Sequence, residues 1–299
     1  MNATLGRVVA IGGGHGLSRT LRGLRDVAEH VTAIVTVADD GGSSGRLREQ
    51  YGVLPPGDLR MALAALSRRP ERAALLQQRF DGGDLDGHAL GNVLLLGLLA
   101  AAGGDLVAAL AQAAEIVDAA GVVLPCTTEP MTLVADTASG RVIGQVAVAR
   151  ARDITRVHLL PDPPPAVPEA VLAVSEADVI VLGPGSVFTS ILPNLLVPGL
   201  AGAIASSAAL TILVGNLWEQ RGETEGLSLA DHVRALHDHV PDLSIDLLLA
   251  DDDPGGLPVP SARDVGCAVA TASLRAPTGG HDPQLLGTAL AEAAAAIPA

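Results

Sequence analysis

The stretch that decides the fold is Val8-Val9-Ala10-Ile11-Gly12-Gly13-Gly14-His15-Gly16, in which a short apolar run leads directly into a glycine-rich turn. A helical pattern over about residues 17–27 follows the turn, and a second β-branched run occupies 31–37. A strand, a helix and a strand at this spacing are typical of a βαβ unit in a parallel sheet. The chain is therefore predicted to open as a Rossmann-like α/β fold.

The rest of the chain extends this pattern outward from the first unit. Apolar runs predict further strands at 157–160, 179–182, 210–214 and 244–249, and an alanine-rich helix at about 283–296. Between the two parts, helical patterns cover about 58–67, 71–80, 89–101 and 106–120, and three short runs within 121–149 suggest an antiparallel hairpin around the turn 137–140. We expect one α/β domain over residues 1–299, with a mostly parallel sheet flanked by helices, a helical segment at about 58–120 and a small β insert at about 121–149.

Composition excludes several kinds of chemistry. All 19 basic residues are arginine, and the net charge is -14. A lysine Schiff base and a Walker lysine are therefore impossible, so a bound phosphate would need arginine, backbone N–H groups, a helix terminus or a metal. The acidic balance and the 1% aromatic content argue against a nucleic-acid partner, which would require a basic surface and stacking side chains.

Location and redox state can also be predicted. No run of about 18 apolar residues is free of Gly, Asn, Pro or charge, and no basic segment precedes an apolar signal core. We expect a cytoplasmic protein with no membrane span. Cys126 and Cys267 are far apart and lack a neighbouring partner cysteine, so we expect two packed thiols rather than a disulfide or a zinc site.

The first candidate binding element is the turn containing Gly12, Gly13, Gly14 and Gly16. Glycine lets the backbone approach a ligand closely, and the following helix offers free N–H groups to a phosphate. Leu17 stands where a dinucleotide-binding fingerprint would have its third glycine, which weakens the case for NAD. The alternative is a tight connection with no ligand.

The second candidate element follows the next strand and contains Asp39, Asp40, Ser43, Ser44 and Arg46. Carboxylates at the carboxyl end of a parallel strand can bind a ribose hydroxyl or a metal, and we take Asp40 as the candidate Mg²⁺ ligand. The serines and the arginine could surround an anion. The alternative is a solvated acidic turn.

Three later segments complete the candidate ligand set. Asn92 lies at the start of an apolar helix, as a ligand contact or a helix cap. Gly183, Gly185 and Ser186 form a second glycine-rich turn after a strand, and Asn216 begins a segment that carries the only tryptophan and could form a lid. Outside this set, His232, His237 and His239 are predicted to lie at the surface, and the run 251–253 to be a solvated acidic end.

Several of these motifs are long enough to indicate a family. They are the run 37–48 with Asp39-Asp40-Gly41-Gly42-Ser43-Ser44-Gly45-Arg46, Leu54-Pro55-Pro56-Gly57-Asp58-Leu59-Arg60, Gly91-Asn92, Gly183-Pro184-Gly185-Ser186 with the run 189–197, and Gly222-Glu223-Thr224. Over about residues 7–250 the chain resembles the YvcK proteins, or gluconeogenesis factors, which are similar in fold to CofD, the 2-phospho-L-lactate transferase. It departs from the family pattern at Ala89, at Trp218-Glu219 and at Gly280, where an arginine is expected.

The resemblance implies a regulatory protein that binds a UDP-sugar, either UDP-N-acetylglucosamine or UDP-glucose. It also implies a link to cell-wall synthesis and cell shape during growth on gluconeogenic carbon sources. We expect no required cofactor, with Mg²⁺ the one candidate, and as partners a UDP-sugar, a second copy of the chain and proteins of cell-wall synthesis. Whether the chain is an enzyme stays open at this point. The alternatives are a CofD-like, Mg²⁺-dependent transferase acting on a nucleotide-diphosphate-linked phospholactyl donor and, from the βαβ opening and Asp39 alone, an NAD(P)-dependent oxidoreductase.

Overall fold

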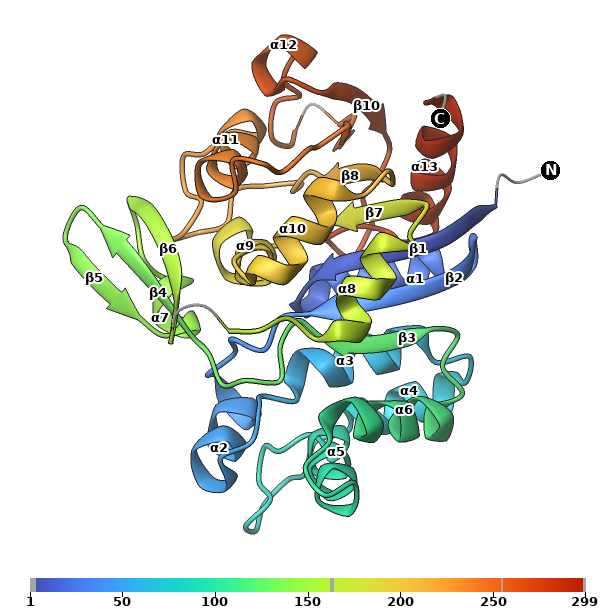
Figure 1. Cartoon of the computed structure of the whole chain (residues 1–299), viewed down its shortest axis with the longest axis vertical. Helices are drawn as coiled ribbons and strands as arrows, with labels where there is room; N and C mark the ends of the chain where they lie inside the picture. Colours follow the sequence, from blue (N-terminus) through green and yellow to red (C-terminus); the bar gives the residue numbers. More distant parts are fainter. Residues whose placement is uncertain (1–3, 162–163, 254, 298–299) are drawn as a thin grey trace.

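A seven-stranded parallel sheet forms the centre of the protein (Figure 1). The computed structural model describes residues 4–161, 164–253 and 255–297. The strand order is β10-β9-β8-β7-β1-β2-β3, and every neighbouring pair is parallel. The strands are β1 (Leu5–Gly12), β2 (Ala28–Val35), β3 (Val122–Pro125), β7 (Val179–Leu182), β8 (Leu210–Val214), β9 (Leu247–Asp251) and β10 (Ala268–Ala272). The predicted Rossmann-like α/β fold is confirmed.

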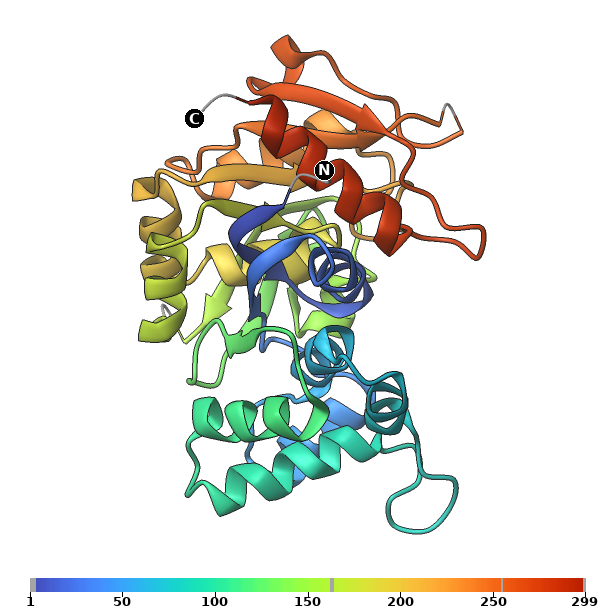
Figure 2. The ribbon, with the colours of Figure 1, turned by 90° about the vertical axis from the view of Figure 1, so that its right-hand side faces the viewer.

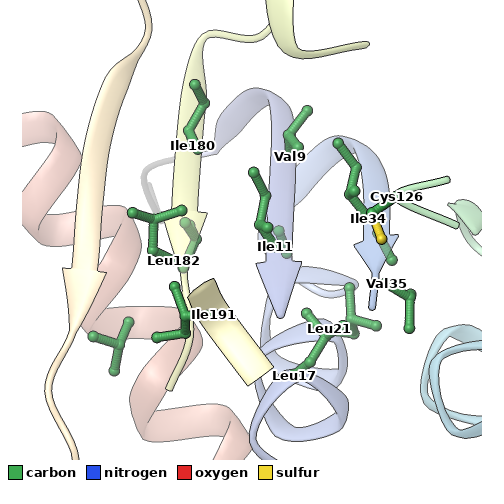
Figure 3. Packing of buried hydrophobic residues seen from close by; sticks show 14 of the residues in the cluster. Val9, Ile11, Leu17, Leu21, Ile34, Val35, Cys126, Ile180, Leu182 and Ile191 are labelled. Atoms are coloured by element: carbon green, nitrogen blue, oxygen red, sulfur yellow. The ribbon is translucent and has the colours of Figure 1, made fainter. Parts of the chain in front are cut away.

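The core is built around β1, the middle strand. Ile11 pairs in register with Ile34 of β2 and Leu182 of β7, and all three side chains are fully buried (Figure 3). β-branched and other apolar residues suit a strand that is covered on both faces, because neither face meets water. The run 8–11 is therefore fully buried at the centre of the sheet.

Helices cover both faces of the sheet (Figure 2). On one face α1 (Gly14–Leu24) packs against α3 (Gly57–Leu66) and α13 (Pro283–Ala296), while α8 (Pro168–Ser175) and α10 (Pro198–Ser206) pack together on the other. The short helix α9 (Leu192–Leu195) and the π-helical turn η1 (Val187–Ile191) follow β7, and α11 (Leu229–His239) follows β8. Together these helices close the apolar core.

The predicted helical segment lies beside the β3 edge of the sheet (Figure 1). It contains α4 (Pro70–Gln77), α5 (Leu90–Ala101) and α6 (Leu106–Val117) in addition to α3. One further helix, α2 (Gly42–Tyr51), occupies the glycine- and serine-rich stretch after Asp40, for which the sequence indicated no helix. Ser43, Ser44 and Leu47 are buried there, so tertiary packing overrides the low helix propensity of the segment.

The β insert exists but has different bounds from those predicted. It is an antiparallel sheet of order β5-β4-β6, made of β4 (Thr132–Thr137), β5 (Gly140–Ile143) and β6 (Ile154–Leu160), with α7 (Gln145–Val148) between the last two. The run at 121–127 is instead β3, an edge strand of the main sheet, and the run at 157–160 belongs to the insert. Short apolar runs identify a strand but not the neighbour with which it pairs, which explains both errors.

Two elements near the end of the chain were not predicted, the edge strand β10 and the short helix α12 (Ala262–Val265). Within the described ranges, no single helix is long and apolar enough to cross a membrane, although the bent pair 187–195 and 198–206 meets the length and composition criteria together.

Candidate functional site

The strand order places a crevice between β1 and β7. From β1 the chain proceeds outward through β2 and β3 on one side, and from β7 through β8, β9 and β10 on the other. The segments that follow the turns after β1 and β7 therefore lead away in opposite directions, and such a switch point is where open α/β sheets bind ligands. The two predicted glycine-rich turns, 12–16 and 183–186, both lie at this point.

The two turns touch each other and hold a fixed shape. A Cβ on Gly16 would overlap the carbonyl oxygen of Pro184, so only glycine permits this approach. Asn216, from the loop after β8, accepts the N–H of Gly185 through Oδ1 (3.1 Å) and donates from Nδ2 to the carbonyl of Gly185 (3.0 Å). The polar atoms of Asn216 are thus used to position the loop.

Ser186 and Gly183 complete the second turn. Ser186 Oγ accepts the N–H of Thr189 at 2.8 Å and so caps the turn that follows β7. Gly183 has φ +75°, a conformation that other residues rarely adopt. These residues therefore explain the shape of the turn.

A pocket of about 280 Å³ opens beside the two turns. Its lining includes His15 and Arg19 from α1, Gly185 from the second turn, and Trp218 from the loop after β8. Because His15 and Arg19 are four residues apart on a helix, they lie on the same face. Side chains of α1 and of the loops after β7 and β8 therefore line one pocket at the switch point.

Arg19 supplies the strongest positive charge of this pocket. One of its guanidinium nitrogens donates to the carbonyl of His281, and none of the ion pairs found among the described residues involves it. The guanidinium lies against Gly280, where an added Cβ would be 2.7 Å from Arg19 Cζ. Sequence reasoning missed Arg19; its spacing from His15 and the glycine at 280 were the available signals.

Asp58, at the start of α3, lies against the first glycine turn. Its carboxyl accepts the N–H of Gly14, and an added Cβ on Gly13 would lie 2.6 Å from Asp58 Oδ2. Burial, followed by the charge of Asp39, raises the pKa of Asp58 to about 7, although the Gly14 hydrogen bond and Arg60 oppose the rise. A titratable carboxyl therefore lies at the amino end of α1. From the sequence, Asp58 was expected only to mark the start of a helix.

Asp39 and Asp40 point in different directions. Asp39 is half-buried, and its Oδ1 accepts the N–H of Gly41 at 2.9 Å. Asp40 is exposed, and its Oδ1 accepts the N–H of Val146, in α7, at 2.9 Å. The charge of Asp39 thus acts on Asp58. Asp40 instead connects the loop after β2 to the β insert.

These positions bear on the expected Mg²⁺. Among the described residues there is no group of three or more His, Cys, Asp or Glu side chains that could hold a metal. Asp39 and Asp58 form a carboxylate pair whose mutual repulsion raises the pKa of Asp58. Mg²⁺ commonly uses one or two carboxylates and takes its other ligands from water and substrate phosphates. Asp39 and Asp58 could supply two such carboxylates, and the role of Asp40 as the Mg²⁺ ligand stays a prediction.

Ser43, Ser44 and Asn92 lie in a buried polar network behind this pair. Ser43 Oγ is 2.9 Å from His88 Nδ1 and accepts from Asn92 Nδ2, also at 2.9 Å. Ser44 Oγ accepts the N–H of Gly57 at 3.1 Å. The network joins α2, α3 and α5, while Asn92 Oδ1 is buried and finds no partner in the described part of the chain.

Arg46 lies away from the pocket. Its side chain is exposed, and it donates to the carbonyl of Asp86 at 2.6 Å, in the loop before α5. Arg46 does not line the switch-point pocket. Arg19, and not Arg46, lines the pocket beside the two glycine turns.

Glu223 is a buried carboxyl near the second turn. Thr189 Oγ1 donates to its Oε1 at 3.4 Å. Burial raises the pKa of Glu223 to about 7, against the lowering effect of hydrogen bonds from Ser186 and Thr189. Glu223 belongs to the motif Gly222-Glu223-Thr224, but nothing in the sequence showed that it would lie behind Ser186.

Two predictions outside the site are wrong. His232 and His239 are buried, not at the surface, and His239 Nε2 accepts the N–H of Val157 at 2.8 Å, which links α11 to β6. Asp251 is also buried and pairs with Arg275 at 2.6 Å, although Asp252 and Asp253 are exposed as expected. Amphipathic spacing alone does not show which histidines a neighbouring sheet covers.

Known proteins resemble this chain over most of its length. The family described as 2-phospho-L-lactate transferase CofD matches residues 8–258. A relative from Nostoc sp. is 49% identical over 234 residues, which are 77% of this chain and 51% of that protein, so this chain spans about half its length. The gluconeogenesis factor of Halalkalibacterium halodurans is 43% identical over 83% of this chain and 78% of its own length.

A solved structure gives the same result for the whole fold. The crystal structure of a UPF0052 family member from Bacillus halodurans superposes with a TM-score of 0.90 at 36% identity, and covers 98% of this chain and 99% of that one. The fold, the motifs and the sequence identity therefore agree, and this chain belongs to the CofD/YvcK family.

Proposed function

We propose that this protein binds a nucleotide-linked sugar, UDP-N-acetylglucosamine or UDP-glucose, at the switch point. In this proposal it acts in the cytoplasm as a regulatory gluconeogenesis factor, linked to cell-wall synthesis and cell shape on gluconeogenic carbon sources. The observation that carries the proposal is the pocket beside two glycine turns, with Arg19 free of any ion pair among the described residues. In a protein without lysine and with a net charge of -14, such a guanidinium suits a diphosphate.

The carboxyl side of the site suits the remainder of the ligand. Asp39 and Asp58 would repel a bare phosphate, but they can accept hydrogen bonds from sugar hydroxyl groups. If Mg²⁺ is bound, the same two carboxylates would hold it, and the ion would neutralise diphosphate charge. The proposal therefore places the diphosphate between Arg19, which lines the pocket, and the two carboxylates, with the sugar hydroxyl groups against Asp39 and Asp58.

A pair of variants on α1 tests this proposal. Calorimetric titration with UDP-N-acetylglucosamine, with and without Mg²⁺, should show binding by the wild type and at least about ten-fold weaker binding by Arg19→Gln, because a charge-assisted hydrogen bond is lost. Arg22→Gln removes the same charge from an exposed position on the same helix and should leave the affinity unchanged. Absence of wild-type binding at millimolar ligand would refute the proposal.

Asp58 favours a second candidate, a CofD-like transferase. A carboxyl with a pKa of about 7 can accept a proton near neutral pH. In such a reaction an acceptor hydroxyl would form a bond to phosphorus, the phosphoanhydride bond to the leaving nucleotide would break, and Asp58 would take the hydroxyl proton. Nucleotide-linked phospholactyl donors and candidate acceptors should then give turnover with the wild type but not with Asp58→Asn, while donor binding persists. Binding without turnover for any donor would leave only the regulatory role.

A further inference from the structure

Trp218 is the only tryptophan of the chain, and it stands at the edge of the switch-point pocket. It follows the buried Leu217 in the loop after β8, and its side chain is 42% exposed. The ring lines both the pocket of about 280 Å³ and a neighbouring hollow of about 440 Å³. A large aromatic side chain is thus presented to solvent at the site rather than packed into the core.

The ring has a rigid support. The guanidinium carbon of Arg275 lies 5.1 Å from the centre of the Trp218 ring, within the range of a cation–π contact. Arg275 Nε donates to Oδ2 of the buried Asp251 at 2.6 Å, and its Nη1 lies 3.2 Å from Oδ1 of Asp253. A Cβ on Gly256 would overlap the guanidinium, so glycine leaves the space that Arg275 needs.

Asp251 connects this support to the sheet. It is the last residue of β9, and its Oδ1 accepts the N–H of Leu274 at 2.9 Å. A charged pair with both members hydrogen-bonded in a largely buried setting has a defined geometry, unlike a surface pair. The orientation of Trp218 is therefore set by a chain of contacts that begins at a core strand.

We propose that Trp218 is the stacking platform for the nucleobase of the ligand, and that the Asp251–Arg275 pair positions it. The inference rests on the proposed function, because it assigns one end of that ligand. Trp218 and Arg19 line the same pocket. In this arrangement the ring face that Arg275 does not cover stacks on the base while the Arg19 guanidinium meets the phosphates. This arrangement gives affinity for a nucleoside diphosphate even without its sugar.

Tryptophan fluorescence tests the assignment directly, because a single tryptophan reports only on this position. UDP and UDP-N-acetylglucosamine should both quench or shift the emission with saturation. N-acetylglucosamine 1-phosphate, which has the sugar and a phosphate but no base, should not. Saturable quenching by the sugar phosphate, with none by UDP, would assign Trp218 to the sugar and overturn the proposal.

Variants separate stacking from support. Trp218→Leu should weaken UDP binding by about ten-fold, and Trp218→Phe should retain most of the affinity, because stacking on an aromatic ring contributes at about this level. Arg275→Gln should weaken binding less, and in the absence of ligand it should make Trp218 more accessible to acrylamide. Arg263→Gln, at an exposed position in α12, is the matched control and should change neither quantity.

The possible results distinguish this inference from the function on which it rests. If the wild type binds UDP-N-acetylglucosamine but Trp218→Leu binds UDP equally well, the platform is refuted and the proposed function stands. If the wild type binds neither compound, the proposed function fails and the platform fails with it. Unchanged acrylamide accessibility in Arg275→Gln would refute the positioning role of the pair.

Discussion

The half-buried Asp58 and the buried Glu223 are carboxyls on the two sides of the switch point, one against the first glycine turn and one behind the second. Burial is the largest cause of the raised pKa in both, and each reaches about 7. An ionised carboxylate without full compensation destabilises a folded protein. Perturbed carboxyls of this kind cluster at functional sites, which agrees with their position here.

Replacing Asp58 should therefore change stability in a pH-dependent way. Its pKa rises from 3.8 to about 7 on folding, so the folded state holds the proton more tightly, and wild-type stability falls as pH rises through this window. Asp58→Asn lacks this loss. Relative to wild type, urea unfolding should show the variant gaining on the order of 4 kcal/mol between pH 4 and a pH well above 7. Asp84→Asn, in an exposed loop, is the control; an equal gain there would contradict the explanation.

At the scale of residues, the sequence predicted the glycines better than the charged groups. Gly16, Gly183 and Gly185 lie at the switch point because turns after parallel strands must meet at one sheet edge. Arg19 and Glu223 were missed because their roles depend on which distant segment lies against them. That information is not present in local spacing.

Two glycines allow a matched test of element packing. Gly16 is in close contact with the backbone of Pro184, whereas an added Cβ on Gly97, in the exposed part of α5, would meet no atom within 4 Å. Gly16→Ala should therefore destabilise the protein by more than about 2 kcal/mol and weaken ligand binding, because the two turns must separate. Gly97→Ala should stabilise it by about 0.5–1 kcal/mol through helix propensity. Thermal unfolding measures both, and a stable Gly16→Ala variant with normal binding would show that the turns can move apart freely.

At the scale of elements, periodicity predicted most strands and helices, but it did not predict their neighbours. β3 and β6 exchanged places relative to the prediction because each is a short apolar run that either sheet can accommodate. β3 joins the main sheet through pairing of Val123 and Leu124 with Ala33 and Ile34. The helix α2 was missed because its serines are buried in a network that forms only when α3 and α5 are present.

For the whole molecule, two histidines and two carboxyls have opposite effects on how the free energy of unfolding changes as pH falls. Burial lowers the pKa of His232 and His281 from 6.5 to about 4, so their contribution to stability is lost as pH falls through that window. Asp58 and Glu223 have pKa values raised to about 7, so they stabilise the folded protein increasingly as pH falls through an overlapping window. The two effects oppose each other between about pH 4.5 and 6.5.

The variant Asp58→Asn/Glu223→Gln should reveal this balance. Between pH 6.5 and 4.5 the double variant should lose more stability on acidification than wild type, since the opposing effect of the two carboxyls is removed and the histidine effect remains. Urea unfolding at a series of pH values measures the slopes. A double variant with the same slope as wild type would contradict the assignment of protons to these four residues.

The position of β1 also has a consequence for synthesis on the ribosome. β1 obtains its first neighbour, β2, almost at once, but its other neighbour, β7, begins only at Val179. At bacterial translation rates the second edge of the central strand stays unpaired for on the order of ten seconds. A nascent chain at this stage has an apolar strand edge open to other chains, so a holding chaperone is expected to act here, before the middle of the sheet and the ligand pocket exist.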